Sequence, residues 1–153
     1  MNSSYPLLER IGLALRAVLL LAWARYLLPQ TKPGDVFARN ERAARLFRSK
    51  IVPASDSTAR SECDMVAYAI PRIAARVPWR SDCLVQALAG QIWLSKSGVA
   101  SEIKVGALKS EDGALQAHAV LACADQLILG GDLEGYEQFI MSAVDARSDL
   151  KRT

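Results

Sequence analysis

The chain has 153 residues, of which 51% are hydrophobic and 23% charged, and its 19 Lys and Arg against 16 Asp and Glu leave a net charge of +3. This balance suits one domain with a single packed core and excludes a largely disordered chain. The basic residues are neither interleaved with aromatic residues nor gathered in one long run, which argues against a nucleic-acid-binding protein.

The cysteines are odd in number, and they form no Cys-x-x-Cys pair; they are Cys63, Cys83 and Cys123. We therefore expect neither a disulfide framework nor a zinc site. Unpaired thiols are typical of a reducing compartment, so the predicted location is the cytoplasm.

The amino-terminal segment 7–28 is rich in Leu and Ala, but its longest uncharged run, residues 17–24, is far shorter than the roughly 20 residues that a membrane-spanning helix needs. Four charged residues interrupt the segment: Glu9, Arg10, Arg16 and Arg25. Ala22-Trp23-Ala24 resembles the cleavage site of a secretory signal, but Glu9 is acidic where such signals are basic. We favour a helix docked on the core over a signal peptide or a helix that attaches to a membrane surface.

Apolar residues recur at helical intervals between Pro6 and Leu28, and Pro29 ends this predicted helix. Its stripe consists of Leu8, Ile11, Leu15, Val18 and Leu19. The sequence predicts a second helix over residues 36–49, whose basic side is exposed to solvent or binds an acidic partner. That side carries Arg39, Arg42, Arg45 and Arg48.

A polar linker is predicted at residues 53–60, followed by a third helix over 61–76 with a kink at Pro71. The residues expected to point toward the core are Met65, Tyr68, Ile73 and Val77. After Pro78-Trp79-Arg80 breaks the chain, a helix is predicted over 83–97, with Asp82 as its N-cap and Gly98 at its end.

Alternating apolar and polar residues then predict three strands, at residues 101–108, 116–124 and 126–129. The first two form an antiparallel hairpin across a polar turn. Gly130-Gly131-Asp132 closes the third strand, and residues 133–147 are either a strand or a short helix. The predicted fold class is α+β, with N-terminal helices and a cysteine-bearing helix packed on a small antiparallel sheet.

Cys83 would lie in the first turn of its helix, where unpaired N–H groups and the aligned peptide dipoles favour an anion. The same N–H groups can stabilise an oxyanion. His118, the one histidine, lies on a predicted strand and shares a face with Val120 and Ala122. If the cysteine helix packs across that face, thiol and imidazole form a nucleophile and a base; otherwise His118 is a satisfied core residue.

The other cysteines are weaker candidates for a nucleophile. Cys123 faces away from His118 on the same strand, and the acidic neighbours of Cys63 disfavour a thiolate. We expect both to be structural. A third group must hold the imidazole in its productive tautomer, and the downstream candidates are Asp125 and Asp132.

These motifs, in this order, resemble the transglutaminase-like cysteine proteases that remove leader peptides during lasso-peptide maturation. The resemblance rests on Cys83-Leu84, on Ala87-Leu88-Ala89, on Gly98-Val99-Ala100, on the strand from Ile103 to Gly106, and on Leu27-Leu28-Pro29 after Ala24-Arg25. It implies a transglutaminase-like or papain-like core with a Cys-His-Asp triad of Cys83, His118 and Asp132.

The sequence departs from the family pattern after the histidine. Where the family has His-Ala-Trp-Val-Glu, this chain has His118-Ala119-Val120-Leu121-Ala122. The place of the family's catalytic Asp holds Gly130, with Asp132 two residues later. Three alternatives remain for the third residue of the triad: Asp132 takes the role after a shift of the loop, Asp125 takes it instead, or the third residue is absent. We favour Asp132.

The resemblance implies a peptidase that cleaves the leader from a ribosomally made lasso precursor through a thiol acyl-enzyme, without metal or organic cofactor. It implies three partners: the precursor leader peptide, a separate leader-recognition protein and the ATP-dependent lasso cyclase. A transamidase or deamidase with the same Cys83 and His118, and a non-catalytic module that binds the precursor, remain as alternatives.

We expect residues 1–60 to form an N-terminal helical region packed on the core, residues 61–147 to form the transglutaminase-like core, and residues 148–153 to form a frayed tail.

Overall fold

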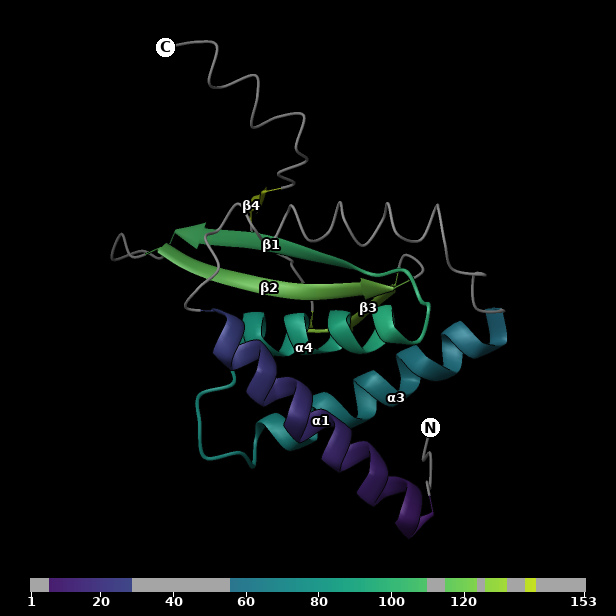
Figure 1. The fold of residues 1–153 in the computed structure, drawn as a ribbon. Helices are drawn as coiled ribbons and strands as arrows, with labels where there is room; N and C mark the ends of the chain where they lie inside the picture. Colours follow the sequence, from purple (N-terminus) through teal and green to yellow (C-terminus); the bar gives the residue numbers. More distant parts are fainter. Residues whose placement is uncertain (1–5, 29–55, 110–114, 124–125, 132–136, 140–153) are drawn as a thin grey trace.

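The computed structural model describes residues 6–28, 56–109, 115–123, 126–131 and 137–139 (Figure 1). The helices are α1 (Leu7–Leu27), α3 (Asp56–Ala74) and α4 (Cys83–Lys96). The strands are β1 (Glu102–Lys109), β2 (Leu115–Cys123), β3 (Gln126–Leu129) and β4 (Glu137–Phe139). The predicted α+β class is confirmed, and the predicted cysteine helix and the three predicted strands agree with α4, β1, β2 and β3 to within one residue at each end.

The four strands form one antiparallel sheet in the order β3-β2-β1-β4. β1 pairs with β2 along its whole length, as expected for the predicted hairpin, and Gly106 lies opposite His118. β3 pairs with the last residues of β2, and β4 with the middle of β1. The long β1–β2 ladder therefore fixes the position of His118 in the sheet.

Helix α4 lies lengthwise under β1 and β2 (Figure 1). The short connection after Gly98 sends β1 back along α4, and β2 reverses again, so that α4 and β2 run in the same direction. The contact is close at Gly90, where a Cβ atom would come 2.7 Å from side-chain carbons of both Leu121 and Leu129. A larger residue at Gly90 would push α4 away from the sheet.

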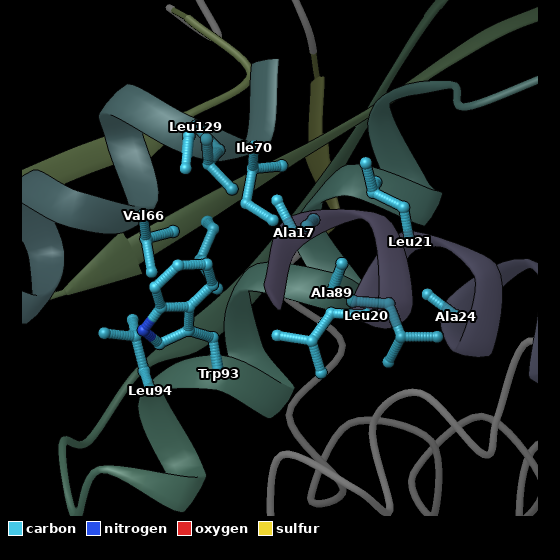
Figure 2. Packing of buried hydrophobic residues seen from close by; sticks show 14 of the residues in the cluster. Ala17, Leu20, Leu21, Ala24, Val66, Ile70, Ala89, Trp93, Leu94 and Leu129 are labelled. Carbon is cyan, nitrogen blue, oxygen red and sulfur yellow. The ribbon is translucent and has the colours of Figure 1, made fainter. Parts of the chain in front are cut away.

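Helices α1 and α3 cross on the other side of α4 (Figure 1). Trp93 is fully buried where the three helices meet, and Figure 2 shows its ring near Val66 and Leu94. Helix α1 contributes Leu13, Ala17, Leu20, Leu21 and Ala24 to this core. It is therefore a helix docked on the protein, as we expected.

The face of α1 that docks differs from the stripe expected from the sequence. Leu8, Leu15 and Leu19 of that stripe are exposed, with Leu8 at 84% and Leu19 at 70%. The helix is apolar on both sides, so the periodicity of its large residues did not identify the docking side. On the docked side, Ala17 and Ala24 are fully buried, and their small side chains let the helices approach closely.

Helix α3 begins within the segment that we expected to be a linker, at Asp56 instead of Ser61. Its buried residues are Cys63, Val66, Ala69 and Ile70. The expected core residues Met65, Tyr68 and Ile73 are only partly buried at the edge of this core. The two sets lie on adjacent faces of one helix, and the position of α4 determines which of them is covered.

A polar network ties the three helices together around Trp93. The Trp93 indole N–H donates to Glu62 Oε2 at 2.8 Å, and the Arg16 guanidinium lies 4.1 Å above the Trp93 ring. Arg16 also forms an ion pair with Glu62 at 3.7 Å and donates to Ser97 Oγ at 3.1 Å. Arg16 of α1 and Glu62 of α3 thus provide polar partners for Trp93 and Ser97 at the C-terminal end of α4.

Replacing Glu62 with Ala should lower the free energy of unfolding by about 1–3 kcal/mol, because it leaves the buried Trp93 N–H without an acceptor. Glu62→Gln is the matched control, since its side-chain oxygen can still accept from the indole. Urea unfolding monitored by Trp fluorescence measures both changes. Equal losses in the two variants would mean that the hydrogen bond to Trp93 contributes nothing.

Our expectation of three unpaired cysteines is wrong. Cys63 of α3 and Cys123 at the end of β2 form a disulfide, with their Cα atoms 6.8 Å apart, and Cys83 is free. Both bonded cysteines belong to the buried core, which agrees with the structural role expected for them. Because disulfides persist in oxidising compartments, the reasoning from unpaired thiols to a reducing compartment no longer holds.

Several expectations fall outside the described residues: the basic helix at 36–49, the turn at 110–113 and the tail at 148–153. Within 133–147, the structure places β4 in the segment that we left between strand and helix. In the ranges that are described, no helix combines the length and the apolar character that crossing a membrane requires. The proposed division at residue 60 stays a prediction.

Candidate active site at the start of α4

Cys83 is the first residue of α4, and Asp82 caps the helix as predicted. The Asp82 Oδ1 atom accepts from the Val85 N–H at 3.2 Å, and the Asp82 carbonyl accepts from the Gln86 N–H at 3.0 Å. The Gln86 side chain donates to the Ser81 carbonyl at 2.8 Å. These bonds hold the chain before Cys83 in a fixed path into the helix, so the thiol has a defined position.

Two N–H groups remain for a ligand at this helix start. Because Asp82 takes up those of Val85 and Gln86, the N–H groups of Cys83 and Leu84 have no acceptor within the described residues. They lie beside a half-buried thiol, the one sulfhydryl group that is not in a disulfide. This arrangement can stabilise the negative oxygen that forms when a thiolate attacks a carbonyl.

Two further polar atoms near Cys83 are buried without a partner in the described part of the chain. They are the indole N–H of Trp79 and the hydroxyl of Ser81. Buried polar atoms are rarely left unpaired, and a bound water, an ion or a catalytic role accounts for many of those that are. Sequence reasoning missed both residues, because it took Pro78-Trp79-Arg80 only as a break before the helix and gave Ser81 no role.

His118 and Cys83 lie at the same height along the shared direction of α4 and β2. The contact of Gly90 with Leu121 fixes the relative height of α4 and β2. Cys83 precedes Gly90 on the helix by about 10 Å, at a rise of about 1.5 Å per residue. His118 precedes Leu121 on the strand by about 10 Å as well, at a rise of about 3.3 Å per residue. Since the two elements run in the same direction, their backbones come level at these residues.

The cysteine helix does not pack across the face of β2 that we expected. Ala119 and Leu121 belong to the core shared with α4, whereas Val120 is fully buried outside that core. Side chains alternate along a strand, so His118 shares the face of Val120, on the side away from α4. Cys83 and His118 thus lie at one height along α4 and β2, but their side chains are on different sides of the sheet. The pairing of thiol and imidazole stays a prediction.

The imidazole of His118 has a partner that no sequence motif announces. Its Nε2 lies 2.5 Å from the carbonyl oxygen of Gly130, at the end of β3. A carbonyl only accepts, so Nε2 carries the proton in this contact. In the sequence, Gly130 occupies the place at which the family pattern has its catalytic Asp, and in the structure its backbone carbonyl contacts the imidazole.

Replacing Gly130 with Ala should move this carbonyl away from His118 and destabilise the fold. Gly130 has φ +90, and a Cβ atom would come 2.6 Å from the backbone oxygen of Ala119. We expect a loss of about 1–2 kcal/mol from the backbone conformation and about 1–3 kcal/mol more from the clash. Gly131→Ala is the matched control, because it has φ +73 with nothing within 4 Å of its Cβ position.

Urea unfolding of both variants measures the difference. If Gly131→Ala costs as much as Gly130→Ala, the close approach to β2 has no energetic weight, and the position of the carbonyl beside His118 is not tightly held.

Asp132 and Asp125, the two candidates for the third catalytic residue, lie outside the described residues. Within the ranges that are described, no group of three or more His, Cys, Asp and Glu residues gathers to hold a metal ion. The candidate site therefore consists of Cys83 with its helix start, the Trp79 and Ser81 atoms that have no partner among the described residues, and His118 with its contact to Gly130.

The family model of the Transglutaminase-like superfamily matches residues 34–141, which is more than half of the chain and includes Cys83 and His118. The chain therefore belongs to this superfamily. Comparisons with curated proteins and with solved structures found no match. Membership indicates acyl chemistry at a cysteine, of the peptidase or transglutaminase type, which agrees with the capped helix that begins at Cys83.

Proposed function

We propose that this protein is a cysteine peptidase that removes the leader from a ribosomally made lasso-peptide precursor through a thiol acyl-enzyme. One observation carries the proposal: the single free thiol is the first residue of a capped helix, beside two N–H groups that have no acceptor among the described residues. Membership of the transglutaminase-like superfamily supports the reaction class. The lasso precursor as substrate rests on the sequence resemblance.

In the first step, the Cys83 thiol loses its proton to Nδ1 of His118, and the thiolate attacks the carbonyl carbon at the junction between leader and core. The N–H groups of Cys83 and Leu84 stabilise the oxyanion. The C–N bond then breaks, and the imidazolium gives its proton to the leaving amine. Water hydrolyses the thioester, releases the leader carboxylate and restores the thiol.

The proposal requires the His118 ring to reach the thiol from the far face of β2. Pairing of β3 with β2 ends at Leu129, and Gly130 then lies beside Ala119 and Val120. His118 is the next residue of β2 beyond that point, and the opposite residue on β1 is Gly106, which has no side chain to block the ring. His118 therefore lies past the β3 pairing and beside a residue without a side chain, which supports the local rearrangement of β2 that the proposal requires.

Asp132 is proposed to complete the triad by supporting the imidazolium, with Asp125 as the alternative. A backbone carbonyl orients the ring but supplies no negative charge, so a carboxylate would add stabilisation when the ring is protonated. Asp132→Asn and Asp125→Asn, compared for the rate of precursor cleavage, identify which carboxylate acts.

The products of the precursor separate this proposal from its rivals. Hydrolysis in H₂¹⁸O yields two peptides, with the label in the new carboxylate of the leader. A transamidase joins an added amine to the acyl group, and a deamidase changes one glutamine side chain without cutting the backbone. Mass spectrometry distinguishes the three outcomes, and an unaltered precursor would favour the non-catalytic binding module.

The proposed partners are the precursor leader, a separate leader-recognition protein and the lasso cyclase. The cytoplasm is proposed as the site of the reaction, although the Cys63–Cys123 disulfide is a bond that reducing compartments do not favour. Cleavage assays with and without reductant show whether the protein works in both redox states.

A further inference from the structure

The N-terminal half of α1 and the C-terminal half of α3 enclose a cleft of about 340 Å³. Leu7 and Ile11 of α1 and Ile73 of α3 form part of its apolar wall, and three arginines line it as well. These are Arg10, Arg72 and Arg76. We refer to this feature as the α1/α3 cleft, and none of its residues belongs to the candidate active site.

The three guanidinium groups of the cleft have no carboxylate partner among the described residues, although Arg16 and Arg80 elsewhere do. Arg72 donates to the Tyr68 carbonyl at 2.8 Å and stacks on the Tyr68 ring at 4.0 Å. Arg76 donates to the Arg72 carbonyl at 2.5 Å. Three cations that line one concavity repel one another, so the cleft favours an anionic ligand.

An exposed apolar surface continues from the cleft along α1. At about 100° per residue, its members fall within an arc of about 120° that contains no charged residue and lies opposite the docked face. The members are Leu8, Ile11, Leu15, Leu19, Trp23 and Tyr26, all of them exposed. Ile11 belongs both to this surface and to the cleft, so one ligand can cover the two together.

We propose that the α1/α3 cleft and the adjoining surface of α1 bind an acidic, amphipathic segment of a protein partner. Apolar side chains of the segment cover Leu7, Ile11 and Leu15, and its carboxylates pair with Arg10, Arg72 and Arg76. Arginine suits this role because its planar group binds carboxylates bidentately, and an amphipathic helix in a groove is a recurring mode of peptide binding.

A membrane surface fits these observations less well. A bilayer is flat on this scale and would meet the convex side of α1, whereas the three arginines line a concave cleft between two helices. The proposal does not depend on the chemistry of Cys83, so the cleft can bind a partner whether or not the protein is a peptidase.

The test uses the full chain and three fluorescein-labelled probes: a designed amphipathic helix of Glu and Leu, the same helix with Lys for Glu, and the Glu peptide scrambled to destroy its apolar face. Fluorescence anisotropy should show binding of the first probe, with the scrambled and Lys peptides at least about tenfold weaker. Raising the salt concentration should weaken the interaction.

The variant Arg72→Glu/Arg76→Glu should weaken binding of the Glu/Leu helix by more than about tenfold, and Arg10→Glu on the other wall should also weaken it. Arg60→Glu is the matched control, because Arg60 is an exposed residue of α3 that does not line the cleft. Thermal melts establish that the variants fold, and Arg10→Glu provides an independent test if the double variant does not.

The proposal is overturned if the Lys peptide binds as well as the Glu peptide, if Arg60→Glu weakens binding as much as the cleft variants, or if no probe binds. Flotation with phosphatidylglycerol vesicles tests the membrane. Flotation that depends on Arg72 and Arg76, without binding of the Glu/Leu helix, would assign the surface to a lipid bilayer instead.

Discussion

Replacing Cys83 with Ala should abolish precursor cleavage, with a loss of at least about 10³-fold in rate, and leave the stability nearly unchanged. The loss is large because no other free thiol is available and the acyl-enzyme cannot form. The stability is preserved because Cys83 is only half-buried at a helix start, whose cap comes from Asp82. Mass spectrometry of the products and a thermal melt measure the two properties.

Two companion variants sharpen this result. Cys83→Ser keeps the size of the side chain and the N–H groups but offers a much weaker nucleophile, so it should be nearly as inactive as Cys83→Ala. Trp79→Phe keeps an aromatic side chain but removes the indole N–H, which has no partner among the described residues, so it should lower kcat if that donor contacts the substrate. Processing by Cys83→Ala at the rate of the native protein would instead establish a non-catalytic role.

The site was predictable where it depends on short stretches of chain. Asp82 before an apolar helix, Gly98 after it and the alternation in β1 and β2 are local signals, and the structure has the corresponding elements where we expected them. Such signals report backbone conformation through nearest neighbours, which is why they placed Cys83 at a helix start and His118 on a strand.

Features that depend on tertiary packing could not be predicted in this way. Two faces of α1 are apolar, and only the positions of α3 and α4 determine which one is buried. The face of β2 that α4 covers depends in the same way on the fit of Gly90 against Leu121. Periodicity identifies the candidate faces of a helix or strand but does not reveal their partners.

The partner of His118 was unpredictable for another reason. Sequence reasoning searches for side chains of suitable chemistry, and the group at Nε2 is a backbone carbonyl, which every residue has. Gly130 was conspicuous only as the residue in place of the expected Asp. Its positive φ and its close approach to β2, which require glycine, bring that carbonyl to the imidazole.

Breaking the Cys63–Cys123 disulfide should produce the largest change in stability. The bond closes a loop with a sequence separation of 60 residues and ties α3 to the end of β2. The loss of chain entropy in the unfolded state corresponds to about 4 kcal/mol for such a loop. The double variant Cys63→Ala/Cys123→Ala should lose at least this much, because both side chains are also buried.

Urea unfolding with and without dithiothreitol isolates the contribution of the bond itself. Reductant should lower the unfolding midpoint of the native protein and have no effect on the double variant, which has no disulfide to reduce. Cys83→Ala should respond to reductant as the native protein does, since Cys83 takes no part in the bond. An unfolding midpoint of the native protein that reductant leaves unchanged would show that α3 and β2 are held together by packing alone, and would restore the case for a reducing compartment.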